Sequence, residues 1–252
     1  MLKIENLHFS YNGKSRDVLK GASLQLQEGQ VGILLGKNGS GKTTLFKSLL
    51  GIVKPKKGSI SFCGENFLKL NRIQRARRIA YVPQDVQFGD LTVFDSVLMG
   101  RISYFGIQAT REDYETVETI LKDMGLWELA HRNATELSGG EKQKIAIARA
   151  MAQQPMLMVF DEPTGNLDIA NEQLIIREAK SLAKEKNIAV LASLHDFNQA
   201  LALGDVFFFM KDGQVKYQGG KEIFTPEVIK DIFDADVELL EKDGKTVIVN
   251  KF

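Results

Sequence analysis

The chain has 252 residues, of which 44% are hydrophobic and 26% charged, a composition that supports a sizeable core and excludes a disordered protein. Its 33 Lys and Arg residues almost balance its 32 Asp and Glu residues, so a net charge of +1 gives no basic field that would favour nucleic acid. The only cysteine, Cys63, excludes an intrachain disulfide and fits a reducing cytosol. The opening residues lack the apolar segment of a secretory signal, and no uncharged run approaches the ~18 residues of a membrane span. We therefore expect any membrane role to depend on a partner.

The first part of the chain is dominated by strand patterns separated by turns. Apolar alternation and apolar runs predict strands at residues 2–10, 22–26, 31–35, 59–63 and 79–82. The third of these strands is followed by a glycine-rich turn and then by apolar spacing that suits a helix over residues 43–50.

Helical periodicity dominates from about residue 92 to residue 153, and strand character then returns. Amphipathic helices are expected at 111–124 and 139–153, and a further helix at 170–186. Strands are expected at 156–160 and 188–193, with a hairpin at 205–210 and 214–218, then two short helices and a last strand pair around 243–244. The alternation predicts a mostly parallel sheet covered by helices, with a helical insertion in its middle.

The glycine-rich turn fits the pattern G-x-x-x-x-G-K-[ST] from Gly36 to Thr43. Glycines adopt backbone conformations that a Cβ would obstruct, so several N–H groups can point at one anion beside the positive end of a helix. Lys42 adds a full charge near the β- and γ-phosphates, and the Thr43 hydroxyl is placed to ligate Mg²⁺. The residues expected to hold a nucleotide triphosphate are Gly36, Lys37, Asn38, Gly39, Ser40, Gly41, Lys42, Thr43 and Thr44. The alternative is a glycine-rich surface turn, which the complete pattern between a strand and a helix disfavours.

Two adjacent carboxylates end the strand at 156–160. Asp161 at the end of an apolar strand of this fold can hold Mg²⁺ directly or through water, and Glu162 could polarise a water for in-line attack on the γ-phosphate. The alternative is a charged turn that ends a strand.

The segment Leu137–Glu141 opens a predicted helix. Ser138 is a natural N-cap, and Glu141 three residues later completes a capping box, so this segment could be no more than a well-started helix. Gly139 and Gly140 are unusual for that purpose because each costs helix stability. They make sense where another molecule's phosphate must approach the backbone closely.

These motifs resemble the ATP-binding subunits of ABC transporters, and the resemblance covers essentially the whole chain. Residues 36–43 match the Walker A motif, residues 156–161 the Walker B motif, and residues 137–141 the family signature, which kinases and GTPases lack. The resemblance implies an α/β P-loop NTPase (RecA-like) core with a mixed sheet, an N-terminal antiparallel β-subdomain and an inserted α-helical subdomain. It implies one domain over residues 1–252, with 1–84 and 155–252 forming the core and tail and 85–154 the helical signature subdomain.

Further residues match the family in the expected order. Gln84 is similar to the glutamine that senses Mg²⁺ and relays movement to the membrane partner, and His195 resembles the switch histidine that contacts the γ-phosphate. Residues 166–168 look like the loop that communicates across the dimer. Tyr11 lies where the family places an aromatic residue to stack on adenine, although it could equally cap the edge of the first strand. The resemblance thus implies catalytic roles for Glu162, His195, Gln84 and Lys42, nucleotide contacts for Tyr11, Gln84, Asp161 and His195, and Mg²⁺ contacts for Thr43, Gln84 and Asp161.

The mechanism implied by the resemblance uses ATP and Mg²⁺ between two subunits. Two copies would pair head to tail, each supplying Walker A residues to one ATP and the signature residues Ser138, Gly139, Gly140 and Glu141 to the other. ATP would then hold the subunits together, and hydrolysis would release them. Expected partners are integral membrane permease subunits and an extracytoplasmic substrate-binding protein, with this chain on the cytoplasmic face of a prokaryotic cell membrane and no nucleic acid involved.

The transported substrate is addressed only by a pattern resemblance. Residues 81–84, 91–101 and 219–227 look like the importers of iron–siderophore, haem and cobalamin complexes. Residues 163–168 are instead typical of lipoprotein-release and macrolide-export ATPases, and a soluble regulatory ATPase stays a further alternative. The apolar residues after Gln84 predict a groove for a permease helix, although they could form the subdomain's own core: Phe88, Leu91, Val93, Phe94, Met99, Tyr104 and Phe105.

Overall fold

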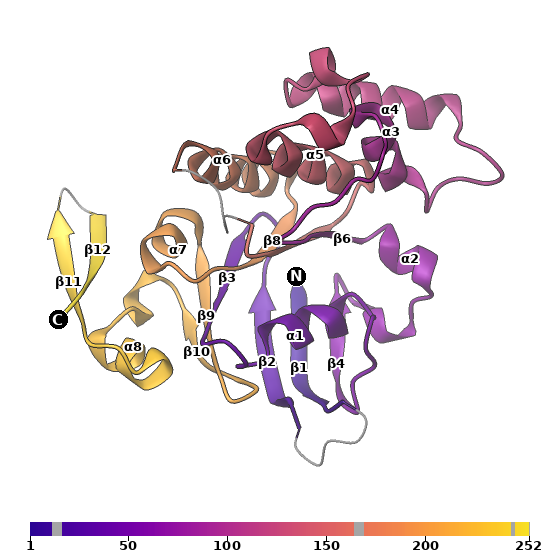
Figure 1. Cartoon of the computed structure of the whole chain (residues 1–252). Helices are drawn as coiled ribbons and strands as arrows, with labels where there is room; N and C mark the ends of the chain where they lie inside the picture. Colours follow the sequence, from indigo (N-terminus) through magenta and orange to yellow (C-terminus); the bar gives the residue numbers. More distant parts are fainter. Residues whose placement is uncertain (12–16, 164–168, 243–244, 252) are drawn as a thin grey trace. The chain divides into compact units, whose positions relative to one another are not determined.

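The computed structural model describes residues 1–11, 17–163, 169–242 and 245–251 (Figure 1). The chain divides into two compact units, the first formed by Met1–Leu70 with Ala179–Phe252 and the second by Asn71–Glu178. The expected helical insertion at 85–154 lies inside the second unit, and its boundaries stay a proposal.

The first unit contains an antiparallel sheet in which the strand order is β2-β1-β4-β5. Its strands are β1 (Leu2–Phe9), β2 (Leu19–Leu26), β4 (Lys57–Phe62) and β5 (Glu65–Asn66). Apolar side chains of β1, among them Leu2, Ile4 and Leu7, are buried, whereas Glu5 is exposed. The alternation of buried and exposed residues shifts by one position between Ile4 and Leu7, where the pairing with β2 is irregular and Asn6 has a positive φ. The shift keeps Leu7 on the core face of the sheet.

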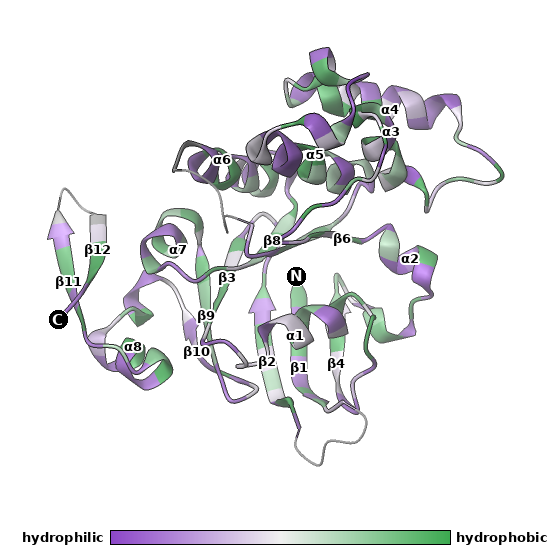
Figure 2. Ribbon diagram, viewed as in Figure 1, coloured by the Kyte–Doolittle hydropathy of each residue, from purple (hydrophilic) through white to green (hydrophobic). Residues whose placement is uncertain are grey.

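A second group of strands in the first unit forms a mixed sheet. The strands are β3 (Val31–Leu35), β8 (Ala189–Ser193), β9 (Val206–Lys211) and β10 (Gln214–Gly219). β3 runs parallel to both β8 and β9, and β9 pairs with β10 in antiparallel fashion. All five residues of β3 are buried, and Figure 2 colours much of β8 and β9 as hydrophobic. A strand that is buried on both faces explains why its sequence reads as a continuous apolar run.

Helices and a terminal hairpin complete the first unit. They are α1 (Lys42–Leu49), α7 (Phe197–Leu203), η5 (Lys221–Ile223), α8 (Pro226–Phe233), β11 (Val237–Lys242) and β12 (Lys245–Asn250). Phe224 packs against Phe207 and Phe209 of β9 with ring centroids 4.8 and 5.1 Å apart. The side chain of Asn198 in α7 bonds both the amide and the carbonyl of Ile248, which anchors β12 to this helix.

The second unit contains a parallel strand pair and most of the helices. Its elements are α2 (Arg72–Ala76), β6 (Ile79–Val82), α3 (Val93–Leu98), η2 (Met99–Arg101), α4 (Arg111–Asp123), η3 (Trp127–Leu129), η4 (Ala134–Glu136), α5 (Gly139–Ala152) and β7 (Leu157–Asp161). The short helix η1 (Phe67–Lys69) precedes them and belongs to the first unit. Capping boxes begin α2, α4 and α5, at Asn71, Thr110 and Ser138. The last long helix, α6, runs from Ile169 to Lys186, and its residues from Ala179 on belong to the first unit.

The sequence-based fold prediction is confirmed in class and in most elements. The structure has a mixed sheet with parallel strands, an antiparallel N-terminal sheet and a helix-rich segment. The helix α7 was not predicted, and the expected turn at 243–244 lies outside the described residues. Among the described residues, no helix has both the length and the apolar character that crossing a bilayer requires.

Candidate functional site

The glycine-rich loop lies between β3 and α1 in the first unit, as expected. Gly39 has φ +81° and Gly41, the N-cap of α1, has φ +111°, conformations that glycine alone adopts at little cost. At Gly36 the constraint is space, because an added Cβ would lie 2.4 Å from the carbonyl oxygen of Met210 in β9. The backbone path of this loop therefore requires glycine at these three positions.

Two polar side chains of the loop fit an anion. Lys42 is buried, and its Nζ donates to the Gly36 carbonyl oxygen at 2.7 Å, which places the ammonium beside the loop. Ser40 is 5% exposed, and its buried Oγ has no hydrogen-bond partner among the described residues. A buried hydroxyl without a partner is costly, so an incoming phosphate oxygen would satisfy it. Together with the amides at the start of α1, these donors suit a nucleotide triphosphate.

Tyr11 lies beside the same loop. Its hydroxyl oxygen is 3.3 Å from Thr44 Oγ1, and its ring packs edge-on against Phe9 with centroids 4.9 Å apart. The Tyr11 side chain is also exposed. A supported, accessible ring next to the phosphate-binding loop is what stacking on a nucleotide base requires.

His195 follows β8, the parallel neighbour of β3. Ser193 lies opposite Leu34 in this register, and the Leu194 amide donates to the Leu34 carbonyl oxygen at 3.4 Å. Because the carboxyl ends of parallel neighbours lie at one edge of a sheet, exposed His195 is next to the strand that leads into the loop. The first unit therefore places Tyr11 beside Thr44 and places His195 after the strand that neighbours β3. The contact of His195 with a phosphate stays a prediction.

A cavity of about 550 Å³ borders the loop within the first unit. It is lined by Lys37, Asn38, Gly39, Ser40, Met210, Lys211, Asp212, Lys230, Asp231, Ile232 and Asp234. Lys211 and Lys230 are each held in ion pairs of 2.7 Å, with Asp231 and Asp236 respectively. The cavity beside the loop is thus lined by both lysine and aspartate side chains.

In the second unit, Asp161 is the last residue of β7 and contacts Tyr81 of the neighbouring strand β6. Tyr81 Oη donates to Asp161 Oδ2 at 3.2 Å. Burial, and then the Asp161 carboxylate, raise the pKa of Tyr81 to about 12, so this hydroxyl keeps its proton at physiological pH. Tyr81 therefore orients the carboxylate that the sequence predicts to hold Mg²⁺.

Glu162 has an unusual backbone conformation. Its φ is +51°, in the left-handed region where a residue with a Cβ is strained by about 1–2 kcal/mol. Such strain is retained chiefly where a fold holds a side chain for a function. This conformation is consistent with the role that the sequence analysis predicts for Glu162, and the positive φ itself has no signal in the sequence.

Gln84 follows β6 and is exposed. β6 and β7 are parallel neighbours in which Val82 lies opposite Phe160, so their carboxyl ends lie at the same edge. The second unit thereby places Gln84, Asp161 and Glu162 at one edge of this strand pair. The residues expected to communicate across a dimer, 166–168, lie outside the described residues.

Ser138 begins α5 through the predicted capping box. Ser138 Oγ and its backbone amide donate to Glu141 Oε2 at 2.7 and 2.9 Å, and the Glu141 amide donates to Ser138 Oγ at 3.3 Å. The hydrogen bonds from Ser138 hold the pKa of the Glu141 carboxyl below its usual value. Gly139 and Gly140 are the first helical residues, and amides at such positions lack intrahelical partners. Gly139 is exposed, whereas Gly140 is buried, and a Cβ added there would clash with the Asn171 side chain. That this helix start binds an anion stays a prediction of the sequence analysis.

Gln143, in the second turn of α5, is a candidate that the sequence analysis missed. Its residue is 4% exposed, and its Nε2 has no hydrogen-bond partner among the described residues. A buried amide without a partner is costly, and an ordered water or a bound group would satisfy it. Its burial could not be read from the sequence because glutamine is usually exposed.

Tyr81→Phe tests the contact with Asp161. We expect the Mg²⁺ concentration that half-saturates ATPase activity to rise about tenfold, because residues that orient a metal ligand typically contribute this much. The Mg²⁺-dependent increase in melting temperature in the presence of ATP should shrink in parallel. Tyr217→Phe is a matched control, since it removes a Tyr–Asp hydrogen bond of the same 3.2 Å length, to Asp231. An equal effect of both variants would contradict the role of Tyr81.

Comparison with known proteins agrees with this arrangement. A family model described as ABC transporter matches residues 19–165. The chain is 37% identical over 249 residues to an uncharacterised ABC transporter ATP-binding protein of Methanocaldococcus jannaschii, covering 99% of this chain and 97% of that protein. It is 31% identical over 253 residues to a Helicobacter pylori protein named as a probable iron chelatin transport ATP-binding protein, covering 98% of each.

Solved structures lead to the same family. A chain from the inward-facing conformation of a transporter assigned to the metal-chelate type superposes with a TM-score of 0.86 at 30% identity. The match covers 100% of this chain and 97% of that one. With the loop, the paired carboxylates and the capped Ser-Gly-Gly helix start in place, the chain belongs to the ABC transporter family as an ATP-binding subunit.

Proposed function

We propose that this chain hydrolyses ATP to power the import of a metal chelate, such as an iron–siderophore, haem or cobalamin complex, through a membrane permease. The observation that carries the proposal is the presence, in one chain, of a glycine-rich loop and of a capped Ser-Gly-Gly helix start at Ser138. In the part of the chain that the structure describes, the Ser40 hydroxyl of that loop has no hydrogen-bond partner. A kinase would need the first feature and would have no use for the second. The similarity to relatives named for iron chelatin transport supports the choice of substrate class.

The roles of the residues follow from their chemistry. Lys42 and the loop amides stabilise the charge on the transferred phosphoryl group, and Glu162 takes a proton from the attacking water. His195 donates to the γ-phosphate. Thr43, Asp161 and Gln84 are the residues we assign to Mg²⁺, which supplies positive charge at the β- and γ-phosphate oxygens when it is bound.

The signature residues act on a second copy of the chain in this proposal. Ser138, Gly139, Gly140 and Glu141 form a helix start that is polarised positively and is satisfied by its own capping box only in part. In a head-to-tail homodimer, this helix start binds the γ-phosphate of the nucleotide held by the other copy's loop. Hydrolysis then removes the anion that joins the two copies, and the dimer opens.

The structure corrects part of the predicted permease-docking groove. Val93 and Phe88 are buried, and the Arg149 guanidinium lies 5.0 Å from the Phe88 ring centroid, so both residues belong to the core of the second unit. Phe94, Tyr104 and Phe105 are half-buried, whereas Leu91 and Met99 are exposed. The sequence analysis missed two exposed apolar residues nearby, Ile102 and Ile107. We assign the docking of a cytoplasmic permease helix to the exposed apolar residues of segment 99–107, which are Met99, Ile102 and Ile107 and are named the docking edge below.

In this proposal the chain is a peripheral subunit on the cytoplasmic face of the membrane. It binds integral membrane permease subunits, and an extracytoplasmic substrate-binding protein serves the same complex. To test the proposal, the tagged chain is purified from membranes together with its permease, and the complex is reconstituted in lipid vesicles. ATPase activity is then measured with the substrate-binding protein and each of a panel of metal chelates. We expect one chelate class to stimulate turnover, and a Lys42→Ala complex to show no stimulation. Stimulation by a lipoprotein or a macrolide would support the exporter alternative. Full activity without any membrane protein would support a regulatory ATPase.

A further inference from the structure

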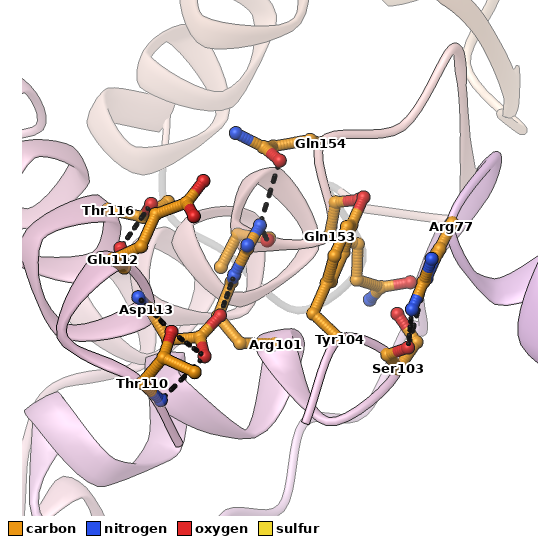
Figure 3. Close-up of polar contacts among 11 residues, drawn as sticks. Arg77, Arg101, Ser103, Tyr104, Thr110, Glu112, Asp113, Thr116, Gln153 and Gln154 are labelled. Atoms are coloured by element: carbon orange, nitrogen blue, oxygen red, sulfur yellow. Dashed lines mark hydrogen bonds and ion pairs between the residues drawn. The ribbon is translucent and has the colours of Figure 1, made fainter. Parts of the chain in front are cut away.

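A fully buried ion pair lies in the second unit, away from the residues assigned to the nucleotide. Arg101 ends η2, Asp113 lies in the first turn of α4, and each side chain is 3% exposed. Arg101 Nε donates to Asp113 Oδ1 at 2.9 Å (Figure 3). Removing two charges from water is costly, and an apolar pair of similar volume often stabilises a fold at least as well. A contribution to the free energy of unfolding therefore does not by itself account for a buried ion pair at this position.

Arg101 also binds the C-terminal end of α5. Its Nη1 donates to the Ala152 carbonyl oxygen at 3.0 Å and to Gln154 Oε1 at 2.9 Å. Tyr104 Oη donates to the next carbonyl oxygen, that of Gln153, at 3.0 Å. The last carbonyl groups of a helix have no partner within it, and a cation is favourable there. Arg101 and Tyr104 thus cap α5 from a segment about fifty residues earlier in the chain, as the sequence separations of 51 and 49 residues show.

The segment that carries these caps is itself held from the other side. The Tyr104 ring lies between two guanidinium groups, with Arg101 Cζ 3.8 Å and Arg77 Cζ 4.5 Å from its centroid. Arg77 donates through Nε and Nη2 to the Ser103 carbonyl oxygen, at 3.0 and 2.7 Å (Figure 3). Asp113 in turn accepts from the amide and hydroxyl of Thr110, at 2.9 and 2.8 Å. Residues 101–104 are therefore fixed to α4, α5 and the end of α2 at once.

The backbone of Gly100, next to Arg101, packs directly against the last turns of α5. An added Cβ at Gly100 would lie 2.1 Å from the Arg149 carbonyl oxygen and 2.9 Å from Ala152 Cβ. Met99 and Ile102, two residues of the docking edge, flank Gly100 and Arg101 directly in the chain and are 46% and 59% exposed. The docking edge and the last turn of α5 are thus joined by close packing, by the ion pair and by hydrogen bonds to consecutive carbonyl groups.

We propose that Arg101 is a positioning residue that makes the docking edge and α5 move as one body, so that a displacement of the edge by a permease segment reaches Ser138. α5 contains 14 residues and spans about 20 Å, with the Arg101 contacts at its last turn and Ser138 at its start. A continuous helix clamped at one end transmits a displacement to the other end, which is how rigid elements carry coupling. The inference rests on the proposed function, because it requires a permease that binds the docking edge and a nucleotide that binds at Ser138.

The test compares variants of the complex purified with its permease. Arg101→Met combined with Asp113→Asn removes both charges together and keeps an acceptor for Thr110, so no charge is left buried without a partner. The matched control, Arg111→Met with Glu115→Gln, removes an exposed ion pair of 2.7 Å from the same helix α4. Tyr104→Phe is a milder variant that loses only the hydrogen bond to the Gln153 carbonyl. For each protein, the basal ATPase rate of the isolated chain and the rate of the permease complex are measured, together with the melting temperature.

We expect the Arg101/Asp113 variant to lower the ratio of stimulated to basal turnover on the order of tenfold, while basal turnover and co-purification with the permease stay as in the unmodified chain. Tyr104→Phe should lower the ratio less, and the control pair should leave it unchanged. A ratio that is unchanged in both test variants would overturn the inference. A parallel loss of basal and stimulated turnover would also overturn it, since this is the result of a purely structural role. If the unmodified chain shows no stimulation by its permease, the proposed function itself fails.

Discussion

Glu162→Gln is expected to leave ATP binding intact and to lower the ATPase rate by about a hundred- to ten-thousandfold, the usual contribution of a general base. The amide keeps the size of the side chain and its hydrogen-bonding capacity but cannot take a proton from the attacking water. Because the nucleotide would persist between the two copies, the variant should also accumulate as an ATP-dependent dimer. Single-turnover hydrolysis and size-exclusion chromatography with and without ATP measure both effects.

Glu128→Gln is a suitable control for this variant, since it removes an exposed carboxylate from the same unit. It should change neither turnover nor oligomeric state. Unchanged turnover in Glu162→Gln would assign the base to another residue. Loss of ATP binding would show that Glu162 supports the binding site instead of the chemistry.

Lys42→Ala is expected to weaken ATP binding itself. A hydrogen bond from a charged donor contributes about 1.5–3 kcal/mol, so the dissociation constant for ATP should rise about 10- to 100-fold. Adenosine lacks the phosphates and is expected to contact Tyr11, so its affinity should stay nearly unchanged. Calorimetric titration with a non-hydrolysable ATP analogue and with adenosine gives both values.

Lys54→Ala controls for the loss of one positive charge, because Lys54 is exposed in the turn that follows α1. It should leave both affinities as they are. If Lys42→Ala weakened adenosine and the ATP analogue equally, the variant would have disturbed the loop as a whole, and the direct phosphate contact would be rejected.

The local features of this protein could be predicted from its sequence. Each depends on residues close together in the chain: the apolar run of β3, the glycine-rich turn after it, and the capping box between Ser138 and Glu141. The prediction of which apolar residues are exposed failed in part. Val93 is buried and Ile102 is exposed, although both are β-branched residues in the same amphipathic region, because neighbouring helices decide which face is covered.

The features that escaped prediction are non-local or conformational. The hydrogen bond between Tyr81 and Asp161 joins residues 80 positions apart, and it exists because β6 and β7 are parallel neighbours. The contacts of Arg101 with the end of α5 have the same origin in tertiary packing. The positive φ of Glu162 has no sequence signal, since it opposes the intrinsic preference of the residue.

The shape of the Walker A loop has a consequence for the thermodynamics of binding. Three internal constraints hold it: the close approach of Gly36 to Met210, the bond from the Gly213 amide to the Ser40 carbonyl oxygen at 2.9 Å, and the bond from Lys42 to Gly36. A loop that is ordered in advance loses little conformational entropy when its ligand arrives, so more of the contact energy remains as affinity. We therefore expect nucleotide to enter and leave this loop without refolding of its backbone.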